Sequence, residues 1–163
     1  MDNSGKIVTL EKLVTRLDRV RNSATKIVFT NGCFDIMHVG HVRYLAAARS
    51  RGDMLIVGLN SDASVRLIKG DRRPIVRQDH RAEVLASLAC VDHIVIFREP
   101  DPLRLIQAIK PDILVKGEDW EADAIIGAED VKSRGGEIVR ISFVEETSTT
   151  GIIQTILERY RGE

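Results

Sequence analysis

Two histidines, His38 and His41, have residue types and a spacing that suit phosphate chemistry. The apolar run at 27–29 predicts a buried strand before them, and the apolar spacing that follows them predicts a helix. Between the histidines, Gly40 lets a phosphate or ribose lie close to the backbone, because glycine has no Cβ. A helix N-terminus offers free N–H groups and the positive end of the helix dipole. The sequence therefore predicts a phosphate site beside both imidazoles.

The same H-x-x-H spacing also fits a zinc pair or two surface histidines. A zinc site needs further ligands, and no third His, Cys or carboxylate stands at an obvious zinc-ligand spacing in the sequence. A strand before the motif and a helix after it favour the phosphate interpretation, since a short motif depends on its structural context. We therefore expect no metal site built from protein ligands.

The length of 163 residues is sufficient for one domain with a sizeable core. We expect one domain over 1–163, with an N-terminal helical extension at 1–24 and a catalytic core at 25–157. The 24 basic and 24 acidic residues cancel, which argues against nucleic acid as a partner.

The two cysteines, Cys33 and Cys90, have no motif spacing and indicate a reduced protein. The sequence shows no signal peptide and no apolar run of roughly 18 residues, so we expect a cytoplasmic location and no membrane contact. Cys33 lies beside the predicted phosphate site, where a packing role is favoured over a chemical one. Its position still places it among the candidates for nucleotide contact.

Strand-like and helix-like patterns alternate along the chain, which predicts an α/β fold. Strands are expected near 26–30, 54–59, 93–97, 111–117 and 137–143. Continuous apolar runs are typical of parallel strands covered on both faces, so we expect a Rossmann-like, doubly wound sheet of five parallel strands. Polar segments follow the strand ends. Their side chains should therefore meet at one edge of the sheet, at a topological switch point where ligands bind.

Several of these polar segments contain candidate substrate ligands. After the second strand come Asn60 and Asp62, and the Asp62 carboxylate either caps a helix or contacts substrate. Lys69 has a point charge on a flexible stem that suits a moving triphosphate, and Arg73 follows in the next loop. The alternative for both is a solvated charge on a turn. Hydroxyl residues at 148–150 begin the last helix, where they suit phosphate but also fit an ordinary N-cap.

The H-x-G-H sequence at 38–41 resembles the signature of the nucleotidyltransferase superfamily with the cytidylyltransferase-like fold. The runs N-G-C-F-D-I-M-H-V-G-H at 31–41 and K-G-D-R-R-P at 69–74 resemble one branch, the adenylyltransferases of ADP-heptose synthesis. The start of the last helix is similar to the second superfamily signature, I-S-[ST]-T-x-x-[RK]. It departs from this pattern in having Thr147 in place of Ile and Ile153 where some branches have Arg.

Two further segments gain a role only from this resemblance. The run K-G-E-D-W at 116–120 is similar to a family motif, K-G-x-D-[WY], that lies close to the adenine and ribose. For its Trp120, stacking on the base and packing as core or lid are both open. Arg81 stands in a segment similar to the glycerol-3-phosphate cytidylyltransferases, whose matching arginine faces the active site.

The resemblance implies transfer of AMP from ATP to D-glycero-β-D-manno-heptose 1-phosphate, with release of pyrophosphate. The ADP-heptose formed in this way feeds the inner core of lipopolysaccharide. The resemblance also implies Mg²⁺ bound with ATP, ATP and heptose 1-phosphate as small-molecule partners, and a homodimer. Two alternatives stay open: a cytidylyltransferase acting on glycerol 3-phosphate or a related alcohol phosphate, and a nucleotide-binding regulatory module without turnover.

The expected site residues fall into three groups. The catalytic residues are His38, His41 and Lys69. The nucleotide-binding residues are Asn31, Gly32, Cys33, Phe34, Gly40, His41, Lys116, Gly117, Asp119, Trp120, Ser148, Thr149 and Thr150. The substrate-binding residues are Asp35, Asn60, Asp62, Lys69, Arg73 and Arg81.

Overall fold

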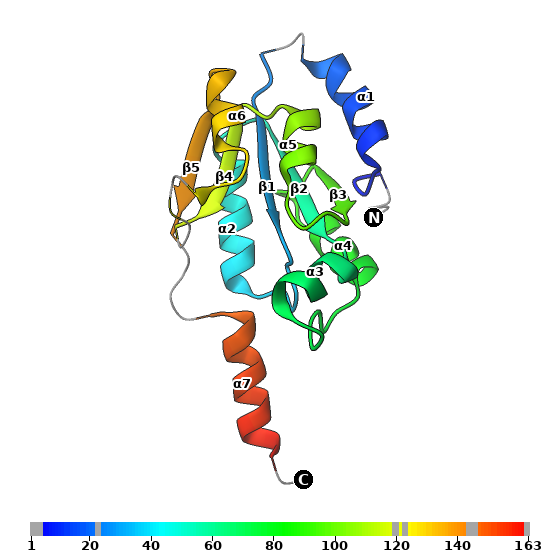
Figure 1. Cartoon of the computed structure of the whole chain (residues 1–163), viewed down its shortest axis with the longest axis vertical. Coiled ribbons are helices and arrows are strands. Elements are labelled where there is room, and N and C mark those ends of the chain that lie inside the picture. The colour runs from blue at the N-terminus through cyan, green and yellow to red at the C-terminus, as the bar shows by residue number, and fades with distance from the viewer. Residues whose placement is uncertain (1–4, 22–23, 119–120, 122–123, 143–146, 162–163) are drawn as a thin grey trace.

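The computed structural model describes residues 5–21, 24–118, 121, 124–142 and 147–161. Its strands are β1 (Ile27–Gly32), β2 (Met54–Asn60), β3 (His93–Phe97), β4 (Ile113–Gly117) and β5 (Glu137–Ile141). Its helices are α1 (Leu10–Val20), α2 (Val39–Arg49), α3 (Asp62–Lys69), α4 (Gln78–Ala86), α5 (Leu103–Ile109), α6 (Ala128–Ser133) and α7 (Thr149–Tyr160). Figure 1 shows their arrangement.

The strands are parallel and form one sheet in the order β3-β2-β1-β4-β5. Residues 27–30 of the central strand β1 are all buried, as expected for a strand covered on both faces. Because β2 and β4 lie on opposite sides of β1, the strand order reverses between β1 and β4. The predicted doubly wound parallel sheet is confirmed, and its switch point lies between these two strands.

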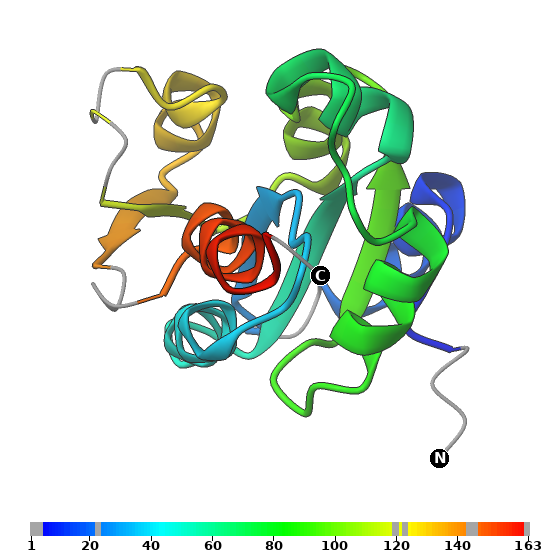
Figure 2. The ribbon, with the colours of Figure 1, turned by 90° about the horizontal axis from the view of Figure 1, so that it is seen from below.

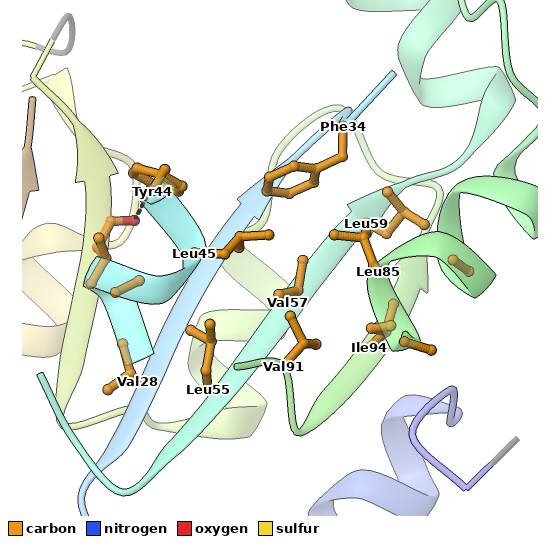
Figure 3. Close-up of a cluster of buried hydrophobic side chains, with 14 of the residues drawn as sticks. Val28, Phe34, Tyr44, Leu45, Leu55, Val57, Leu59, Leu85, Val91 and Ile94 are labelled. Atoms are coloured by element: carbon orange, nitrogen blue, oxygen red, sulfur yellow. Dashed lines mark hydrogen bonds between the residues drawn. The ribbon is translucent and has the colours of Figure 1, made fainter. Parts of the chain in front are cut away.

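Helices cover both faces of the sheet. On one face, α2 and α4 bring Leu45 and Leu85 into a buried cluster with Val57 of β2, and Figure 3 shows these side chains packed together. On the other face, α1 and α5 contribute Leu13 and Ile106 to a second cluster. Burying one such side chain is worth about 1.5–3 kcal/mol. None of the described helices is long and apolar enough to cross a membrane.

One element is shorter than its sequence pattern predicts. The apolar spacing favours a helix over 122–134, whereas α6 begins at Ala128. Gly127 has a φ of 84°, and a Cβ at this position would lie 2.6 Å from the Ile106 side chain. The backbone therefore turns immediately before α6, in a conformation that glycine adopts without strain.

The last helix, α7, extends away from the rest of the chain below the carboxyl ends of the strands (Figure 1). Ser148 is its N-cap, and the Ser148 hydroxyl accepts a hydrogen bond from the backbone N–H of Gly151 (3.0 Å). No residue of α7 is buried, and Ile156, Leu157 and Tyr160 are exposed. The expected last helix is present, but its apolar side chains remain largely in contact with solvent.

Candidate active site

The H-x-G-H motif lies at the start of α2, as the sequence predicts. His38 is the N-cap residue of this helix, and Gly40 and His41 belong to its first turn. The centroids of the two imidazole rings lie 3.9 Å apart, with the rings tilted by 30°. A Cβ on Gly40 would lie 3.0 Å from two atoms of the His38 ring, so a larger residue would crowd this histidine. Both rings therefore lie beside the free N–H groups of a helix N-terminus.

Burial decides the charge of the two histidines. It lowers the pKa of His38 below its usual value. It also lowers the pKa of His41 to about 4, with a further contribution from the nearby His38. At neutral pH both imidazoles are therefore mainly uncharged. Among the described residues, no group forms a hydrogen bond with the buried Nδ1 atom of either ring. Both Nδ1 atoms are therefore available to a polar ligand, as is the unpaired Nδ1 of His93 outside this site.

The loop between β1 and α2 is held in shape by Asp35. Its neighbours Phe34 and Ile36 have φ angles of 45° and 50°, in the left-handed region that costs roughly 1–2 kcal/mol per residue. The buried Asp35 carboxylate accepts hydrogen bonds from the Arg73 guanidinium (2.6 Å) and from the backbone N–H groups of residues 75 and 76 (2.8 Å each). Burial by itself would raise the pKa of Asp35, but these hydrogen bonds lower it overall. Asp35 and Arg73 thus join this loop to the segment before α4.

Arg81 makes a second link between the same parts of the chain. Its guanidinium donates hydrogen bonds to the carbonyl oxygens of Val76 (2.8 Å), Asn60 (2.9 Å) and Cys33. It also donates one to the carboxylate of Asp62 (2.8 Å). Arg81 is 1% exposed, and these contacts use most of the N–H groups of a guanidinium. These bonds give Arg81 and Asp62 a positioning role. Substrate contact, which the sequence predicts for Arg81 and leaves open for Asp62, stays a prediction.

The strand ends at the switch point carry two further predicted residues. The ammonium group of Lys116, at the end of β4, donates a hydrogen bond to the side-chain oxygen of Asn31, at the end of β1. The start of α7 lies against the same region, because the Thr149 hydroxyl donates a hydrogen bond to the backbone carbonyl of Asp35 (2.7 Å). In the view from below (Figure 2), α7 accordingly stands in front of the strand ends, close to α2.

A cavity of about 420 Å³ opens at this edge of the sheet. Its wall contains many of the residues that the sequence predicts for the site: Asn31, Gly32, Cys33, Phe34, Asp35, His41, Asn60, Lys69, Arg73, Lys116, Gly117, Thr149 and Thr150. Other predicted residues lie beside the cavity without lining it: His38, Gly40, Asp62, Arg81 and Ser148. Asp119 and Trp120 lie outside the described residues, so their predicted contact with the nucleotide stays a prediction.

The cavity wall also contains residues that the sequence did not single out: Tyr44, Ile68, Pro100, Asp101, Pro102 and Ile126. Tyr44 stands three residues after His41, one helical turn away, so helical spacing was a signal for it. The segment 100–102 follows the end of β3, and the rule that ligands bind at the carboxyl ends of strands was a signal for it as well. No sequence signal marks Ile126.

The sequence of this chain is similar to that of known proteins. Residues 29–155 match the cytidylyltransferase-like family. The bifunctional protein HldE of Pelobacter propionicus is 49% identical over 159 residues, which are 98% of this chain and 33% of that protein. HldE of Helicobacter pylori is 53% identical over 151 residues, 93% of this chain and 31% of that protein. The chain thus spans about a third of the length of these relatives.

Solved structures of other proteins have a similar fold, in agreement with the family match. A lipopolysaccharide core biosynthesis protein from Thermoplasma volcanium has a TM-score of 0.64 and 30% identity, over 75% of this chain and 100% of that chain. Pantothenate synthetase from Thermus thermophilus has the same fold, with a TM-score of 0.62 at 17% identity, over 90% of this chain and 67% of that chain. The family match includes both histidines and most of the cavity wall. The chain therefore belongs to the cytidylyltransferase-like family.

Proposed function

We propose that the chain transfers AMP from ATP to D-glycero-β-D-manno-heptose 1-phosphate, so that ADP-heptose and pyrophosphate form. One observation carries this proposal: a helix N-terminus suited to phosphate and several cationic and hydroxyl side chains meet at one cavity. His41, Lys69, Lys116 and Thr149 come from four different elements, and all of them line it. Such a combination suits the binding and transfer of phosphate groups.

The reaction requires alignment and charge neutralisation, and it needs no general base. A phosphate oxygen of the sugar phosphate is already an anion near neutral pH, and it attacks the α-phosphorus of ATP. A new P–O bond forms, while the bond from the α-phosphorus to the bridging oxygen breaks and its electron pair leaves with pyrophosphate. Negative charge develops around the α-phosphorus in the transition state, so fixed hydrogen-bond donors at this position lower the barrier.

The described residues supply such donors at three places. His38 and His41 donate hydrogen bonds to the oxygens of the α-phosphate, beside the N–H groups at the start of α2. The exposed Lys69, at the end of α3, follows the phosphates on its flexible stem. The Thr150 hydroxyl and the free backbone N–H groups at the start of α7 hold the departing pyrophosphate.

The choice of ATP and heptose 1-phosphate rests on relatives. The runs at 31–41 and 69–74 resemble the heptose adenylyltransferases. The HldE proteins are 49% and 53% identical to this chain, and the structural relative from T. volcanium acts in lipopolysaccharide core biosynthesis. The match to the cytidylyltransferase-like family supports a second candidate, a cytidylyltransferase acting on glycerol 3-phosphate or a related alcohol phosphate.

We include Mg²⁺ in the proposal as a companion of ATP. The described residues contain no group of three or more His, Cys, Asp or Glu side chains arranged to hold a metal ion. In this proposal the substrate phosphates and water would hold the ion, which is common for Mg²⁺. When bound, Mg²⁺ neutralises phosphate charge.

We also propose that the protein forms a homodimer and is located in the cytoplasm. Both proposals rest on the family resemblance. Light scattering on the purified protein measures its molar mass. A mass near twice the 18.2 kDa of one chain supports the dimer, and a mass near that of one chain contradicts it.

The first test is pyrophosphate release in the presence of Mg²⁺, with ATP and CTP each combined with heptose 1-phosphate and glycerol 3-phosphate. We expect release with ATP and heptose 1-phosphate and background rates in the other three combinations. Release with CTP and glycerol 3-phosphate would keep the mechanism and replace the substrates. Tight ATP binding without release in any combination would instead support the regulatory module.

A further inference from the structure

One carboxylate in the cavity wall has no part in the reaction described above. Asp101 lines the cavity between Pro100 and Pro102, after the end of β3. Its Oδ1 accepts a hydrogen bond from the backbone N–H of Leu103 (2.9 Å), the first residue of α5. Among the described residues, no donor contacts its other carboxylate oxygen. The proline on each side restricts the backbone, so this carboxylate is held in place before a ligand binds.

Asp101 differs in this respect from Asp35, which also lines the cavity. Both oxygens of Asp35 accept hydrogen bonds, from Arg73 and from two backbone N–H groups. The Asp35 side chain is also 0% exposed, so within the described part of the wall Asp101 is the carboxylate with an oxygen that a ligand can reach.

The charges in the cavity restrict what Asp101 can bind. Lys69 and Lys116 line the same cavity and attract phosphate, whereas an ionised carboxylate repels it. A carboxylate accepts hydrogen bonds and donates none. Its partner is therefore a sugar hydroxyl, the amino group of adenine, or a Mg²⁺ ion bound with ATP.

The position of Asp101 favours the sugar phosphate over the nucleotide. The Ser64 hydroxyl donates a hydrogen bond to the backbone carbonyl of Glu99 (2.9 Å) and accepts one from Asn60 (2.9 Å). These contacts hold the segment before Asp101 against α3 and the end of β2, on the side of the cavity where Lys69 lies. The segment that resembles the adenine and ribose motif begins instead at Lys116, beyond the switch point, on the β4 side of the sheet.

We propose that Asp101 binds a hydroxyl group of the sugar phosphate that accepts the nucleotide, and so selects a polyhydroxylated acceptor. This inference rests on the proposed function and adds a residue for substrate specificity to it. The simpler role for Asp101 is to cap the start of α5 through Oδ1, and the experiment has to separate the two roles.

The variant Asp101→Asn separates them, because asparagine keeps a side-chain oxygen for the N–H of Leu103 and loses the charge. Calorimetry measures the Kd of heptose 1-phosphate in the presence of a non-reactive ATP analogue, and the Kd of ATP by itself. We expect the variant to bind heptose 1-phosphate roughly tenfold to a hundredfold more weakly, as for a lost hydrogen bond to a charged acceptor. ATP affinity and the melting temperature should stay unchanged.

The matched control is Asp53→Asn. Asp53 also accepts one backbone hydrogen bond, from Lys26 (2.8 Å), but it lies at the opposite edge of the sheet, immediately before β2. This control should leave both Kd values unchanged.

Three outcomes with Asp101→Asn would overturn the inference. Unchanged affinity for heptose 1-phosphate would leave Asp101 with the capping role. Weaker binding of ATP alone would assign the carboxylate to the nucleotide, or to its Mg²⁺ if the effect requires the metal. Weaker binding of both ligands with a lower melting temperature would show a structural role. If the unmodified protein does not bind heptose 1-phosphate, the proposed function itself fails, and this inference fails with it.

Discussion

His41 is the residue on which the proposed chemistry depends most. It stands in the first turn of α2, its pKa is lowered to about 4, and its Nδ1 has no hydrogen-bond partner among the described residues. An uncharged imidazole donates one hydrogen bond and tolerates burial without a counter-ion. When negative charge develops beside it, the ring gains affinity for a second proton. We therefore expect His41 to bind phosphate more strongly in the transition state than in the ground state.

Replacing His41 with Ala should lower the rate constant of pyrophosphate release about 10²- to 10³-fold, as for the loss of a donor that acts in the transition state. The KM for ATP should change much less. Steady-state kinetics measures both values, with His80→Ala as the control because His80 is an exposed histidine on α4. Near-normal turnover of the His41 variant would contradict the assignment.

The pKa of His41 should also respond to the nucleotide. In the free protein, an NMR titration should give a value near 4, and saturation with ATP should raise it, because phosphate charge favours the imidazolium. An unchanged value with ATP bound would mean that His41 does not contact phosphate.

The same pKa makes folding stability depend on pH. Because the pKa of His41 in the folded state lies below its usual value of 6.5, the unfolded chain binds more protons between pH 4 and 6.5. Stability should therefore fall as the pH drops through this window. The lowered pKa of Asp35 adds a loss at lower pH, as this carboxylate becomes protonated. Urea unfolding measures this loss. Between pH 6.5 and 4.5, the His41→Asn variant should lose less stability than the unmodified chain. An equal loss in both proteins would mean that the lowered pKa of His41 is not its cause.

At the scale of elements, Tyr44 connects the helix of the motif to two strands. The Tyr44 hydroxyl lies 2.7 Å from the hydroxyl of Thr30 in β1, and it donates a hydrogen bond to the carbonyl of Val115 in β4 (3.3 Å). Figure 3 shows Tyr44 at the edge of the buried cluster under α2. Because Tyr44 lies one turn after His41, these bonds fix the position of the motif relative to the switch point.

Replacing Tyr44 with Phe should therefore lower both stability and turnover. The variant leaves the buried hydroxyl of Thr30 and a carbonyl without their partner, at a cost of about 1–3 kcal/mol. Chemical unfolding measures this loss, and kinetics should show a lower kcat with little change in KM. The matched control is Tyr160→Phe on α7, where the tyrosine is 64% exposed. Equal effects of the two substitutions would rule out this role for Tyr44.

The elements around the site follow from local sequence patterns, but several side-chain roles do not. Apolar runs mark the strands, and capping hydroxyls mark the starts of α1, α3 and α7, because burial and capping depend on neighbouring residues. For Arg81 and Asp35 the sequence predicts substrate contact, which stays a prediction. It does not show their hydrogen bonds to backbone groups, because these groups belong to distant segments. The sequence pattern predicts a helix longer than α6 for a related reason. The packing of Gly127 against Ile106 is a tertiary contact, which a local pattern does not show.

At the scale of the whole molecule, the sheet brings the site together. Segments from 31 to 150 in sequence meet at one edge, because parallel strands all end there. Two apolar clusters, one on each face, hold this edge in place. α7 begins at the cavity and then leaves the body of the chain, with its apolar side chains exposed (Figure 1). The catalytic chemistry thus depends on the sheet as a whole, and no single segment contains the site.

Joining of AMP to a sugar phosphate can be followed directly through the phosphorus atoms of the products. The most direct test is ³¹P NMR of the purified protein with Mg²⁺, ATP and heptose 1-phosphate. We expect the ATP signals to be replaced by equal amounts of pyrophosphate and of a diphosphate diester, the signature of ADP-heptose. Formation of ADP with a sugar bisphosphate, or of AMP and pyrophosphate with the sugar phosphate unchanged, would contradict this expectation.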